Sequence, residues 1–558
     1  MRFAARSRDT VIDPRRVKQA LRSTAFLAVL SLATYLRGTG LSWGLTSGYG
    51  HYRNFQPDEF ISLRGVLQLD LLAGRIKAPG AYFEGTFNYY LWAVPQAALK
   101  VSKAAARPVT SPNTDDHSDL LYACRWMSVL FDLCTIIVVF LAIREATQNF
   151  YPSLVGAFCY AVLPMQVIYA HFMRTHLLSN LLCAMVIWLS LKFRKRQSWW
   201  MLITVGLISG LGAATRYPVG IIIVIPCLYL LFARRDDLPN WRIRLWERAK
   251  GFVAGSVWLI GLGFVIGLFL GHPMLFLNSP SVTKAITGET LKYASLQEFN
   301  ASQLVNLSAV WKYISYLIPF AMYPFLWLVP YCAILYLGFR RSLYSQFVPI
   351  LIFSLLYLYF MAKGYVGPYF ARATMLLFPG FCVLIGIAYD DLRFRFRKQR
   401  AVVIFVTANL LLLLVPSVGF DVAYVQGMRQ RDARSALCQD LQQIIGRSPA
   451  TIGVLRSGGY FHTVMPAIEP LKSTTVTTRL QDARQPADFL LVGFLGPIDR
   501  VQLNATIKQV EEQGIFSYQR SYYVRPQLFG RELQLTRFPS DMMYPFPTIL
   551  LFPAKTDT

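Results

Sequence analysis

Charged residues are scarce in this chain, at 15% of its 558 residues, while 54% are hydrophobic. A soluble protein would carry about a quarter charged residues. The apolar residues also gather in runs that are close to the length needed to cross a bilayer. This excludes an ordinary soluble enzyme, and we expect a polytopic α-helical membrane protein.

Side chains that form metal sites and disulfides are also few. The eight cysteines and six histidines form no Cys-x-x-Cys or His-x-x-x-His grouping, so we predict no structural zinc site. Only Cys438 lies in the polar C-terminal region, which excludes a disulfide framework there. Neither GxGxxG nor GxxxxGK[ST] occurs, so no cofactor is predicted and no phosphate-binding loop indicates a water-soluble nucleotide substrate.

Acidic residues are outnumbered by basic ones, 30 to 56, which gives a net charge of +26. The basic residues crowd into short segments between apolar runs, as they do in the cytoplasmic loops of membrane proteins. This placement indicates membrane orientation and no nucleic-acid partner.

Eleven apolar segments are predicted to span the membrane. A further stretch, residues 87–101, contains Pro95 and Gln96 and is predicted to lie as an interfacial helix on the membrane surface. The predicted spans are residues 21–43, 120–143, 151–170, 176–192, 198–215, 218–233, 251–271, 313–338, 346–362, 372–389 and 401–418.

The positive-inside rule predicts a cytoplasmic N-terminus in a plasma or inner membrane. Residues 1–418 then form the membrane domain, with a long first outer loop at about 44–119. Residues 419–558 form a small α/β domain on the outer, periplasmic or lumenal side. Its predicted elements are strands at 451–455, 487–494 and 544–552, and a helix at 498–513.

This topology brings polar residues from separate loops to the outer surface. Two adjacent carboxylates, Asp58 and Glu59, lie in the first loop. Burying a carboxylate beside lipid costs free energy, so their position indicates that they have a role. Single arginines and lysines at span ends commonly just extend toward water. Outer loops are normally depleted of such cations, however. The cations and histidines placed opposite the carboxylates are His171, Arg174, His176, Arg216, His272, Lys363 and Arg372.

Such a set suits transfer of a group from a membrane-borne phosphate. Arginine and lysine bind phosphate, and arginine forms two parallel hydrogen bonds to it. A nearby carboxylate can remove a proton from an incoming hydroxyl as a general base. We therefore expect a lipid-linked donor substrate.

Short motifs along the membrane region occur at residues 36–43 followed by Pro57-Asp58-Glu59, 88–92, 124–132, 169–176, 210–218 and 371–379. In their order and their side of the membrane, they resemble GT-C glycosyltransferases of the protein O-mannosyltransferase and lipid A aminoarabinose-transferase type. The resemblance implies a GT-C fold. It also implies an inverting transferase that moves a sugar, hexosyl or pentosyl, from a polyprenyl-phosphate carrier to an acceptor glycan, lipid or protein.

The resemblance also implies roles for individual residues. Asp58 would be the catalytic base or would orient the acceptor, with Glu59 supporting it. The donor phosphate would be bound by Arg372 and Arg216, with Lys363 and Arg174 beside them. His171, His176 and Arg125 would contact substrate.

One position departs from the family pattern. His176 stands where the family often has Asp or Glu, and this weakens a metal-dependent mechanism. His171 and His176 could still bind a divalent metal, but two histidines five positions apart in a turn are not a specific metal signature.

Two other classes of function stay open at this point. A transporter or flippase of amphiphilic substrates would use the same cations for binding alone, and would place ionisable residues near mid-span. Arg125 and Asp132 are the main residues of that kind. A non-catalytic scaffold would tolerate replacement of Asp58.

Overall fold

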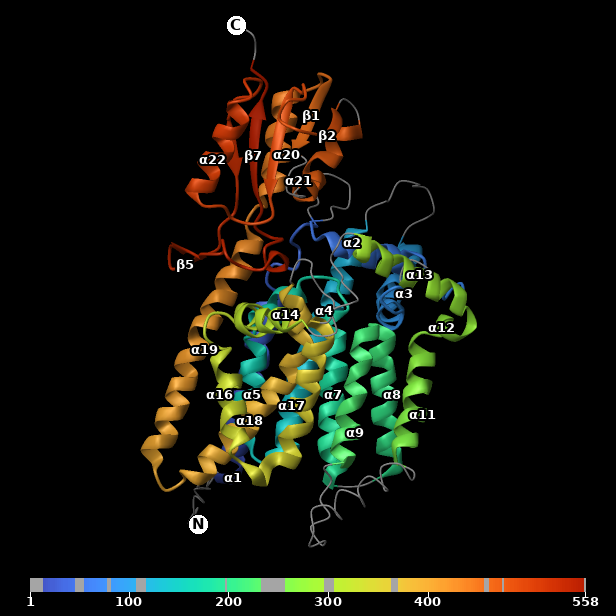
Figure 1. The fold of residues 1–558 in the computed structure, drawn as a ribbon, viewed down its shortest axis with the longest axis vertical. Coiled ribbons are helices and arrows are strands. Elements are labelled where there is room, and N and C mark those ends of the chain that lie inside the picture. Colours follow the sequence, from blue (N-terminus) through green and yellow to red (C-terminus); the bar gives the residue numbers. More distant parts are fainter. Residues whose placement is uncertain are drawn as a thin grey trace, which may run out of the picture.

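The apolar runs of the sequence form a bundle of helices in the computed structural model, with a smaller domain at one end (Figure 1). The structure describes residues 14–45, 55–77, 82–106, 117–195, 198–231, 256–295, 306–362, 370–455, 461–473 and 476–555. The helices of the bundle are α1 (Pro14–Gly38), α4 (Ser118–Thr147), α5 (Phe150–Ala161), α6 (Pro164–Ala170), α7 (His176–Lys195), α8 (Trp199–Thr215), α9 (Val224–Leu231), α11 (Val257–Gly271), α14 (Leu307–Lys312), α15 (Ile318–Ala321), α16 (Leu328–Gly338), α17 (Tyr344–Ala362), α18 (Phe378–Arg395) and α19 (Arg400–Arg429).

Helices occupy the described parts of all eleven predicted spans. Among the described residues, five helices are individually long and apolar enough to cross a membrane, or six if α5 and α6 count as one span bent by 58°. Four shorter apolar helices occupy further predicted spans, namely α8, residues 217–231, α11 and α16. The prediction of a polytopic helical membrane protein is confirmed, and the span predicted at 151–170 is a bent pair of helices.

Close packing of α8 against α11 depends on glycines. A Cβ atom at Gly206 or Gly210 would lie 2.1 Å from a backbone oxygen of α11, and one at Gly263 would lie 2.1 Å from the Ile203 oxygen of α8. Only residues without a side chain allow two helix backbones to approach this closely, as in many membrane helix pairs. The sequence spacing Gly206-x-x-x-Gly210 fits that pattern.

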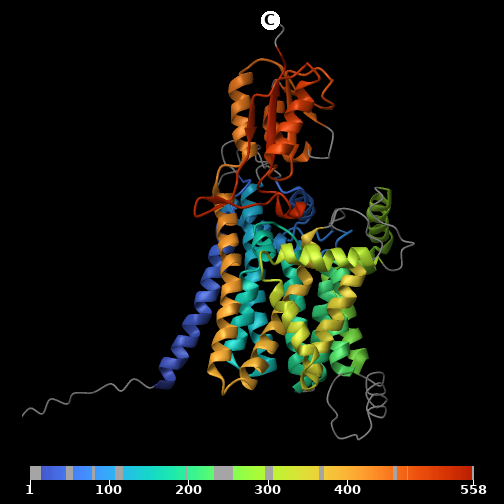
Figure 2. The same cartoon turned by 60° about the vertical axis from the view of Figure 1, so that its left-hand side comes forward.

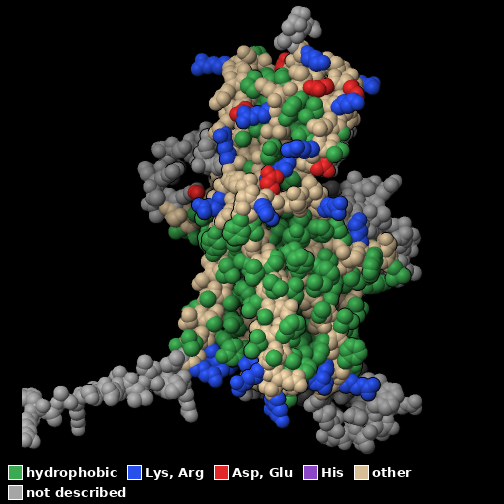
Figure 3. Space-filling view, turned by 90° about the vertical axis from the view of Figure 1, so that its left-hand side faces the viewer, with side chains coloured by type: hydrophobic (Ala, Val, Ile, Leu, Met, Phe, Trp, Pro, Cys, Tyr) green, Lys and Arg blue, Asp and Glu red, His purple; other side chains and the backbone are tan. Residues whose placement is uncertain are grey.

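The side chains on the surface of the bundle are distributed as in a membrane protein. Figure 3 shows a broad belt of hydrophobic side chains around the helices, with Lys and Arg gathered at the end away from the smaller domain. Lys192, Arg194 and Lys195 in the last turn of α7 lie at that end, as do Arg393 and Arg395 of α18. This distribution agrees with the charge pattern from which the topology was predicted.

The first outer loop and the segment after α11 lie above the bundle, on the side of the smaller domain (Figures 1 and 2). Their helices are α2 (Pro57–Leu67), α3 (Phe87–Ala106), α12 (Met274–Leu277) and α13 (Ser279–Ser295). Gly85, at φ +129°, sits directly on the end of α8, because a Cβ there would lie 2.3 Å from the Ala214 oxygen. The helix predicted at residues 87–101 thus occurs as α3, and α2 is a second helix in the same loop.

The smaller domain is built on a five-stranded sheet. Its strands are β1 (Ala450–Leu455), β2 (Val476–Gln481), β3 (Phe489–Phe494), β4 (Arg520–Tyr522) and β7 (Thr548–Pro553), in the order β2-β1-β3-β7-β4. β1 pairs in parallel with β2 and β3, whereas β7 runs antiparallel to β3 and β4. The apolar faces of α20 (Ala433–Ile445) and α21 (Phe461–Ile468) pack in one core cluster, and α22 (Arg500–Glu511) packs in another. The predicted C-terminal α/β domain is confirmed.

The two parts of the molecule are joined more closely than the sequence suggested. α19 runs through the boundary predicted at residue 418 and continues to Arg429. The chain between β6 (Arg531–Glu532) and β7 returns to the bundle, where Phe538, Met542 and Phe546 belong to its main apolar core. The strand predicted at 544–552 therefore starts later, at Thr548, because the residues before it are buried against the bundle.

A buried arginine ties this junction together. Arg434 donates two hydrogen bonds to the Asp432 carboxylate, one to the Phe55 carbonyl (3.2 Å) and one to the Tyr544 carbonyl (2.9 Å). Trp43 donates its indole N–H to the same carboxylate, at 3.1 Å. The start of the first outer loop, the top of α20 and the returning C-terminal segment are thus held by one polar network.

Candidate acid–arginine site

The site begins at the N-terminus of α2. Gln56 caps the helix, with its side-chain oxygen accepting the Glu59 N–H at 2.7 Å, and Pro57 occupies the first turn. A helix N-terminus favours negative side chains because its free N–H groups carry partial positive charge. The first turn therefore suits both Asp58 and Glu59, and it points them in different directions, since successive helical residues are about 100° apart.

Glu59 points into the protein. Its two carboxylate oxygens accept hydrogen bonds from Arg125 at 2.9 and 2.7 Å, and Oε1 also accepts the Met173 N–H at 2.7 Å. Arg125 uses its remaining terminal nitrogen on the carbonyls of Leu41 and Trp43. Both side chains are 1% exposed. The pair joins α2 to α4 and holds the segments on either side of the site.

Asp58 points the other way, toward arginines from distant parts of the chain. Its Oδ2 lies 3.1 Å from Arg372 and 3.9 Å from Arg174. The contact with Arg372 lacks hydrogen-bond geometry, so Oδ2 has no hydrogen-bond partner among the described residues. The side chain keeps 23% of its surface exposed. This carboxylate is therefore held by charge and can still accept a proton.

The arginines also set the ionisation of Asp58. Burial raises the pKa of its carboxyl, but the charges of Arg372 and Arg174 lower it, assisted by the nearby Gln56 side chain and the charge of Arg216. The lowering effects prevail, and the pKa lies below its ordinary value of 3.8. Asp58 is thus an anion across the physiological pH range.

Arg174 connects α2 to the segment before α3. It donates hydrogen bonds to the Asp58 carbonyl (3.0 Å), to Ser62 (3.1 Å) and to a carboxylate oxygen of Glu84 (2.9 Å). The other Glu84 oxygen accepts the Tyr89 hydroxyl at 3.0 Å. Much of the donor capacity of Arg174 is therefore used within the protein.

Arg372 is held from the C-terminal domain. Its backbone N–H donates to Asp541 at 2.8 Å, and the Ala371 N–H donates to the same carboxylate at 3.1 Å. Its guanidinium donates to the Tyr169 hydroxyl at 3.3 Å and lies 4.0 Å from the centre of the Phe370 ring. The side chain is 17% exposed, so part of it faces outward beside Asp58.

Arg216 and His176 complete the cluster. Arg216 follows α8 with an extended backbone, and it lies near enough to act on the ionisation of Asp58. His176 is 2% exposed, its ring centre lies 5.1 Å from that of Tyr169, and neither ring nitrogen has a hydrogen-bond partner in the described parts of the chain. Among the described residues, the His176 ring thus adds two polar atoms without a partner to the cluster. Lys363 lies outside the described residues.

His171 is placed differently from the other predicted site residues. Its two ring nitrogens lie 2.7 Å from the carbonyl oxygens of Val167 and Thr39, and the residue is fully buried. Arg125 is likewise engaged by protein groups. The structure thus brings Asp58, Arg372, Arg174, Arg216 and His176 into one cluster, and it places Glu59, Arg125 and His171 behind that cluster. Within the described ranges, no three His, Cys, Asp or Glu side chains gather in a way that could hold a metal ion.

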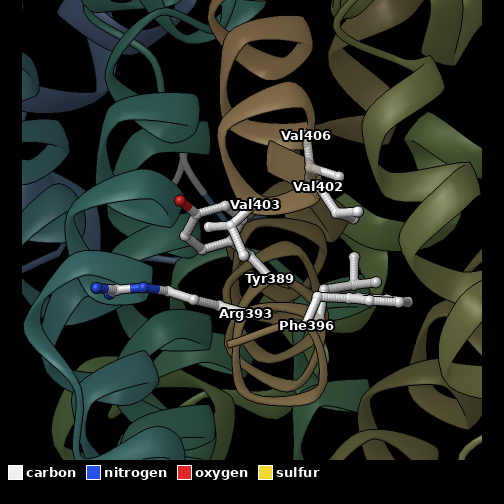
Figure 4. Close-up of a pocket in the computed structure, with 7 residues that line it drawn as sticks. Tyr389, Arg393, Phe396, Val402, Val403 and Val406 are labelled. Atoms are coloured by element: carbon white, nitrogen blue, oxygen red, sulfur yellow. The ribbon is translucent and has the colours of Figure 1, made fainter. Parts of the chain in front are cut away.

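A separate pocket lies at the opposite end of the bundle. It is lined by Tyr389, Leu392, Arg393 and Phe396 of the α18 end and by valines of α19 (Figure 4). Its lining is mainly apolar and contains no carboxylate. It is therefore not part of the acid–arginine site.

Sequence reasoning missed several groups of the site. Glu84 lies in the first outer loop, but no motif marked it. Asp541 lies 169 residues from Arg372 in sequence, in a region that lacks a recognisable motif. Tyr544 is also close, since the charges of Arg372 and Asp58 both act on the pKa of its hydroxyl, which burial raises to about 12. An expectation that the C-terminal segment returns to the bundle would have been needed to find the last two.

The fold and the site together define a polytopic membrane protein with an acid–arginine cluster beneath its C-terminal domain. The profile of the family described as "Dolichyl-phosphate-mannose-protein mannosyltransferase" matches residues 118–242. This match covers less than a quarter of the chain, and it shows that this stretch is similar to that family. No curated protein matches the chain in sequence.

Solved structures show a weaker likeness. The oligosaccharyltransferase AglB of Archaeoglobus fulgidus, in complex with an inhibitory peptide and a dolichol-phosphate, aligns with a TM-score of 0.48 at 13% identity over 81% of this chain. The chain spans 64% of the length of that protein. ArnT of Cupriavidus metallidurans bound to undecaprenyl phosphate aligns with a TM-score of 0.47 at 12% identity, over 96% of this chain and 98% of that one.

Proposed function

We propose that the chain is an inverting glycosyltransferase that moves a hexosyl or pentosyl group from a polyprenyl-phosphate carrier to an acceptor glycan, lipid or protein. The single observation that carries this proposal is Asp58, a partly exposed carboxylate whose Oδ2 atom is paired with Arg372 at 3.1 Å without forming a hydrogen bond. A base next to an anion-binding cation is what sugar transfer from a phosphate carrier requires.

The reaction assigns each group a task. The acceptor hydroxyl attacks the anomeric carbon of the sugar, and its proton passes to Asp58. The bond from that carbon to the phosphate oxygen breaks, and the carrier phosphate leaves with the electron pair. Arg372 and Arg216 stabilise the departing phosphate, and His176 contacts the donor or the acceptor. One such preorganised donor contributes about 3–4 kcal/mol in enzymes where this has been measured.

Glu59, Arg125, His171 and Arg174 act as positioning residues in this proposal. The Glu59–Arg125 pair fixes the start of α2 against α4, and Arg174 fixes the Asp58 carbonyl. Lys363 stays a prediction as a donor-phosphate residue.

We also propose the orientation of the molecule. The basic loops lie in the cytoplasm, and the C-terminal domain lies on the outer or lumenal side of a plasma or inner membrane. The basic end of the bundle in Figure 3 supports this assignment.

The experiment is transfer of radiolabelled sugar from polyprenyl-phosphate donors by the purified chain in lipid vesicles. Asp58→Asn should lower transfer by about 10²- to 10⁴-fold, because an amide cannot take up the proton. The matched control is Asp70→Asn in the same loop, since Asp70 pairs with Arg75 and Lys100 at the surface. Retained transfer in folded Asp58→Asn protein would overturn the base assignment.

Metal dependence is tested in the same assay. We expect that no metal is required, so treatment with EDTA followed by dialysis should leave the transfer rate unchanged. A loss that returns on adding one divalent cation would show the opposite.

One observation favours a second candidate, a transporter or flippase. Arg37 of α1 and Asp132 of α4 form a fully buried ion pair at 2.6 Å, and Tyr160 donates to the same carboxylate. Charged groups deep in a bundle are typical of transport pathways. A fluorescent lipid-flipping assay with the wild-type chain separates the two proposals, since a transporter moves the lipid without breaking its sugar–phosphate bond.

A further inference from the structure

A small hairpin projects from the side of the molecule just above the bundle. It consists of β5 (Gln527–Leu528) and β6 (Arg531–Glu532), joined by Phe529 and Gly530. Figures 1 and 2 both show it beside the upper part of α19, reaching outward between the bundle and the C-terminal domain. Its position relative to the membrane is therefore set by α19.

The tip of the hairpin carries an unusual residue. Phe529 has φ +49° and Gly530 has φ +78°, so both central turn residues are left-handed. Such turns favour Asn-Gly, and a bulky side chain in this conformation is unfavourable. Phe529 is also 96% exposed, so no packing within the chain offsets that cost. Phe529 is thus unfavourable for the conformation of its turn, and its side chain is not buried within the chain. This combination indicates a contact outside the chain.

The contacts of the hairpin with α19 show where the hairpin lies along the axis of that helix. Leu528 packs on Gly419, where an added Cβ would lie 3.0 Å from the Leu528 Cδ2 atom. Below Gly419 on the same helix face are Val415 and Leu412, which are 65% and 68% exposed. These spacings of three and four residues follow one side of a helix. The hairpin thus lies directly above the lipid-facing stripe of α19.

The side chains beside the tip suit a membrane interface. Tyr523 is 49% exposed, and Arg525 stacks 4.8 Å from the centre of its ring. Arg525 also pairs with Glu532 at 2.7 Å, so Arg531 leaves the hairpin with an excess positive charge. Aromatic rings with neighbouring arginines are common where a protein meets lipid headgroups.

From this geometry we propose that the β5–β6 hairpin is a membrane anchor that places Phe529 in the headgroup region of the leaflet facing the C-terminal domain. The partner is the lipid surface itself. The chain that follows the hairpin leads to Asp541, which holds Arg372. The anchor therefore steadies the segment that reaches the site, and its existence does not depend on the reaction proposed above.

The test uses spin labels on the full chain in phosphatidylcholine–phosphatidylglycerol vesicles, with the exposed Cys332 replaced by serine. Labels are placed by Phe529→Cys and, as a control, by Val501→Cys on α22, since Val501 is 78% exposed on the C-terminal domain. We expect the label at 529 to be more accessible to oxygen, and less accessible to a water-soluble nickel complex, than the label at 501. Equal accessibility at both positions would overturn the proposal, and shielding of 529 from both agents would indicate a protein partner instead.

A second measurement avoids any label. Phe529→Asn supplies the residue that this turn favours, so it keeps the hairpin folded and removes only the ring. Backbone hydrogen exchange of residues 523–533 in vesicles should then rise several-fold over the wild type, while in detergent the two proteins should match. Unchanged exchange in vesicles would contradict anchoring.

Discussion

Asp58 and Glu59 are adjacent, chemically alike and placed in one helical turn, yet they lie in two different regions of the molecule. Glu59 is 1% exposed and accepts three hydrogen bonds from Arg125 and Met173. Asp58 is 23% exposed and keeps one oxygen without a hydrogen bond beside Arg372. A fully buried carboxylate with every oxygen hydrogen-bonded holds structure, whereas one that is partly exposed and held mainly by charge can do chemistry.

The same contrast applies to the arginines. Arg125 directs its donors to protein oxygens on α2 and in the segment that follows α1. Arg372 is fixed through its backbone by Asp541, which leaves its guanidinium partly exposed. Fixing a cation through its main chain keeps the charged group available for an anion. The predictions below test whether these two sides of α2 are as distinct as their contacts indicate.

The largest effect is expected on the partly exposed side of α2, where Asp58 lies. Asp58→Asn should lower transfer by about 10²- to 10⁴-fold, the range typical of a lost general base. Its thermal midpoint should fall only slightly, because the ion pair that Asp58 loses with Arg372 is partly exposed and includes no hydrogen bond. Transfer rate and midpoint are measured on the same preparation. A large loss of stability would mean that Asp58 belongs with Glu59 as a structural group.

On the buried side of α2, where Glu59 lies, the free energy of unfolding should change instead. Arg125→Leu leaves the Glu59 carboxylate buried and unpaired, which costs about 3–5 kcal/mol for a pair of this kind. The double variant Arg125→Leu with Glu59→Leu should recover much of that loss, since neither charge is then buried alone. Denaturant unfolding of both single variants and the double variant measures the coupling. Additive losses would show that the two side chains do not act as a pair.

A smaller effect is expected when the support of Arg372 is removed. Asp541→Ala should lower the turnover number about 10- to 100-fold, because small misplacements of a catalytic group have effects of that size. Asp541→Asn retains one acceptor oxygen and should fall in between. The matched control is Asp440→Asn, because Asp440 pairs with Arg520 and Tyr522 elsewhere in the C-terminal domain. A change in KM alone would assign Asp541 to substrate binding rather than positioning.

The smallest effect concerns pH. The pKa of Asp58 lies below 3.8, so its anionic form, and any stability that this form contributes, is present above that value and is lost as pH falls through the lowered pKa. Transfer should therefore show no acid limb from Asp58 above about pH 4. Arg372→Gln removes the largest lowering effect and should move the acid limb of the residual activity upward. Identical pH profiles in both proteins would contradict the coupling of these residues.

Parts of the site could be predicted because they follow from local patterns. Arg174, Arg216 and Arg372 stand at the ends of apolar segments and Asp58 lies in the first loop, and the charge bias of the loops placed all four on one side. Individual contacts could not be predicted from such local patterns. Nothing local distinguishes Asp58 from Glu59, and His171 lies in the same loop as His176 although the two have opposite surroundings.

The sequence by itself determined that the chain enters a membrane, which end carries the basic loops, and that an α/β domain follows. These features depend on the transfer of short segments from water to lipid, and that energy is a sum over neighbouring residues. Only the tertiary structure decided which carboxylate is open, that α5 and α6 are bent, and that Asp541 reaches Arg372. Such pairings depend on the packing of helices and on segments that are far apart in the chain, and no local pattern records them.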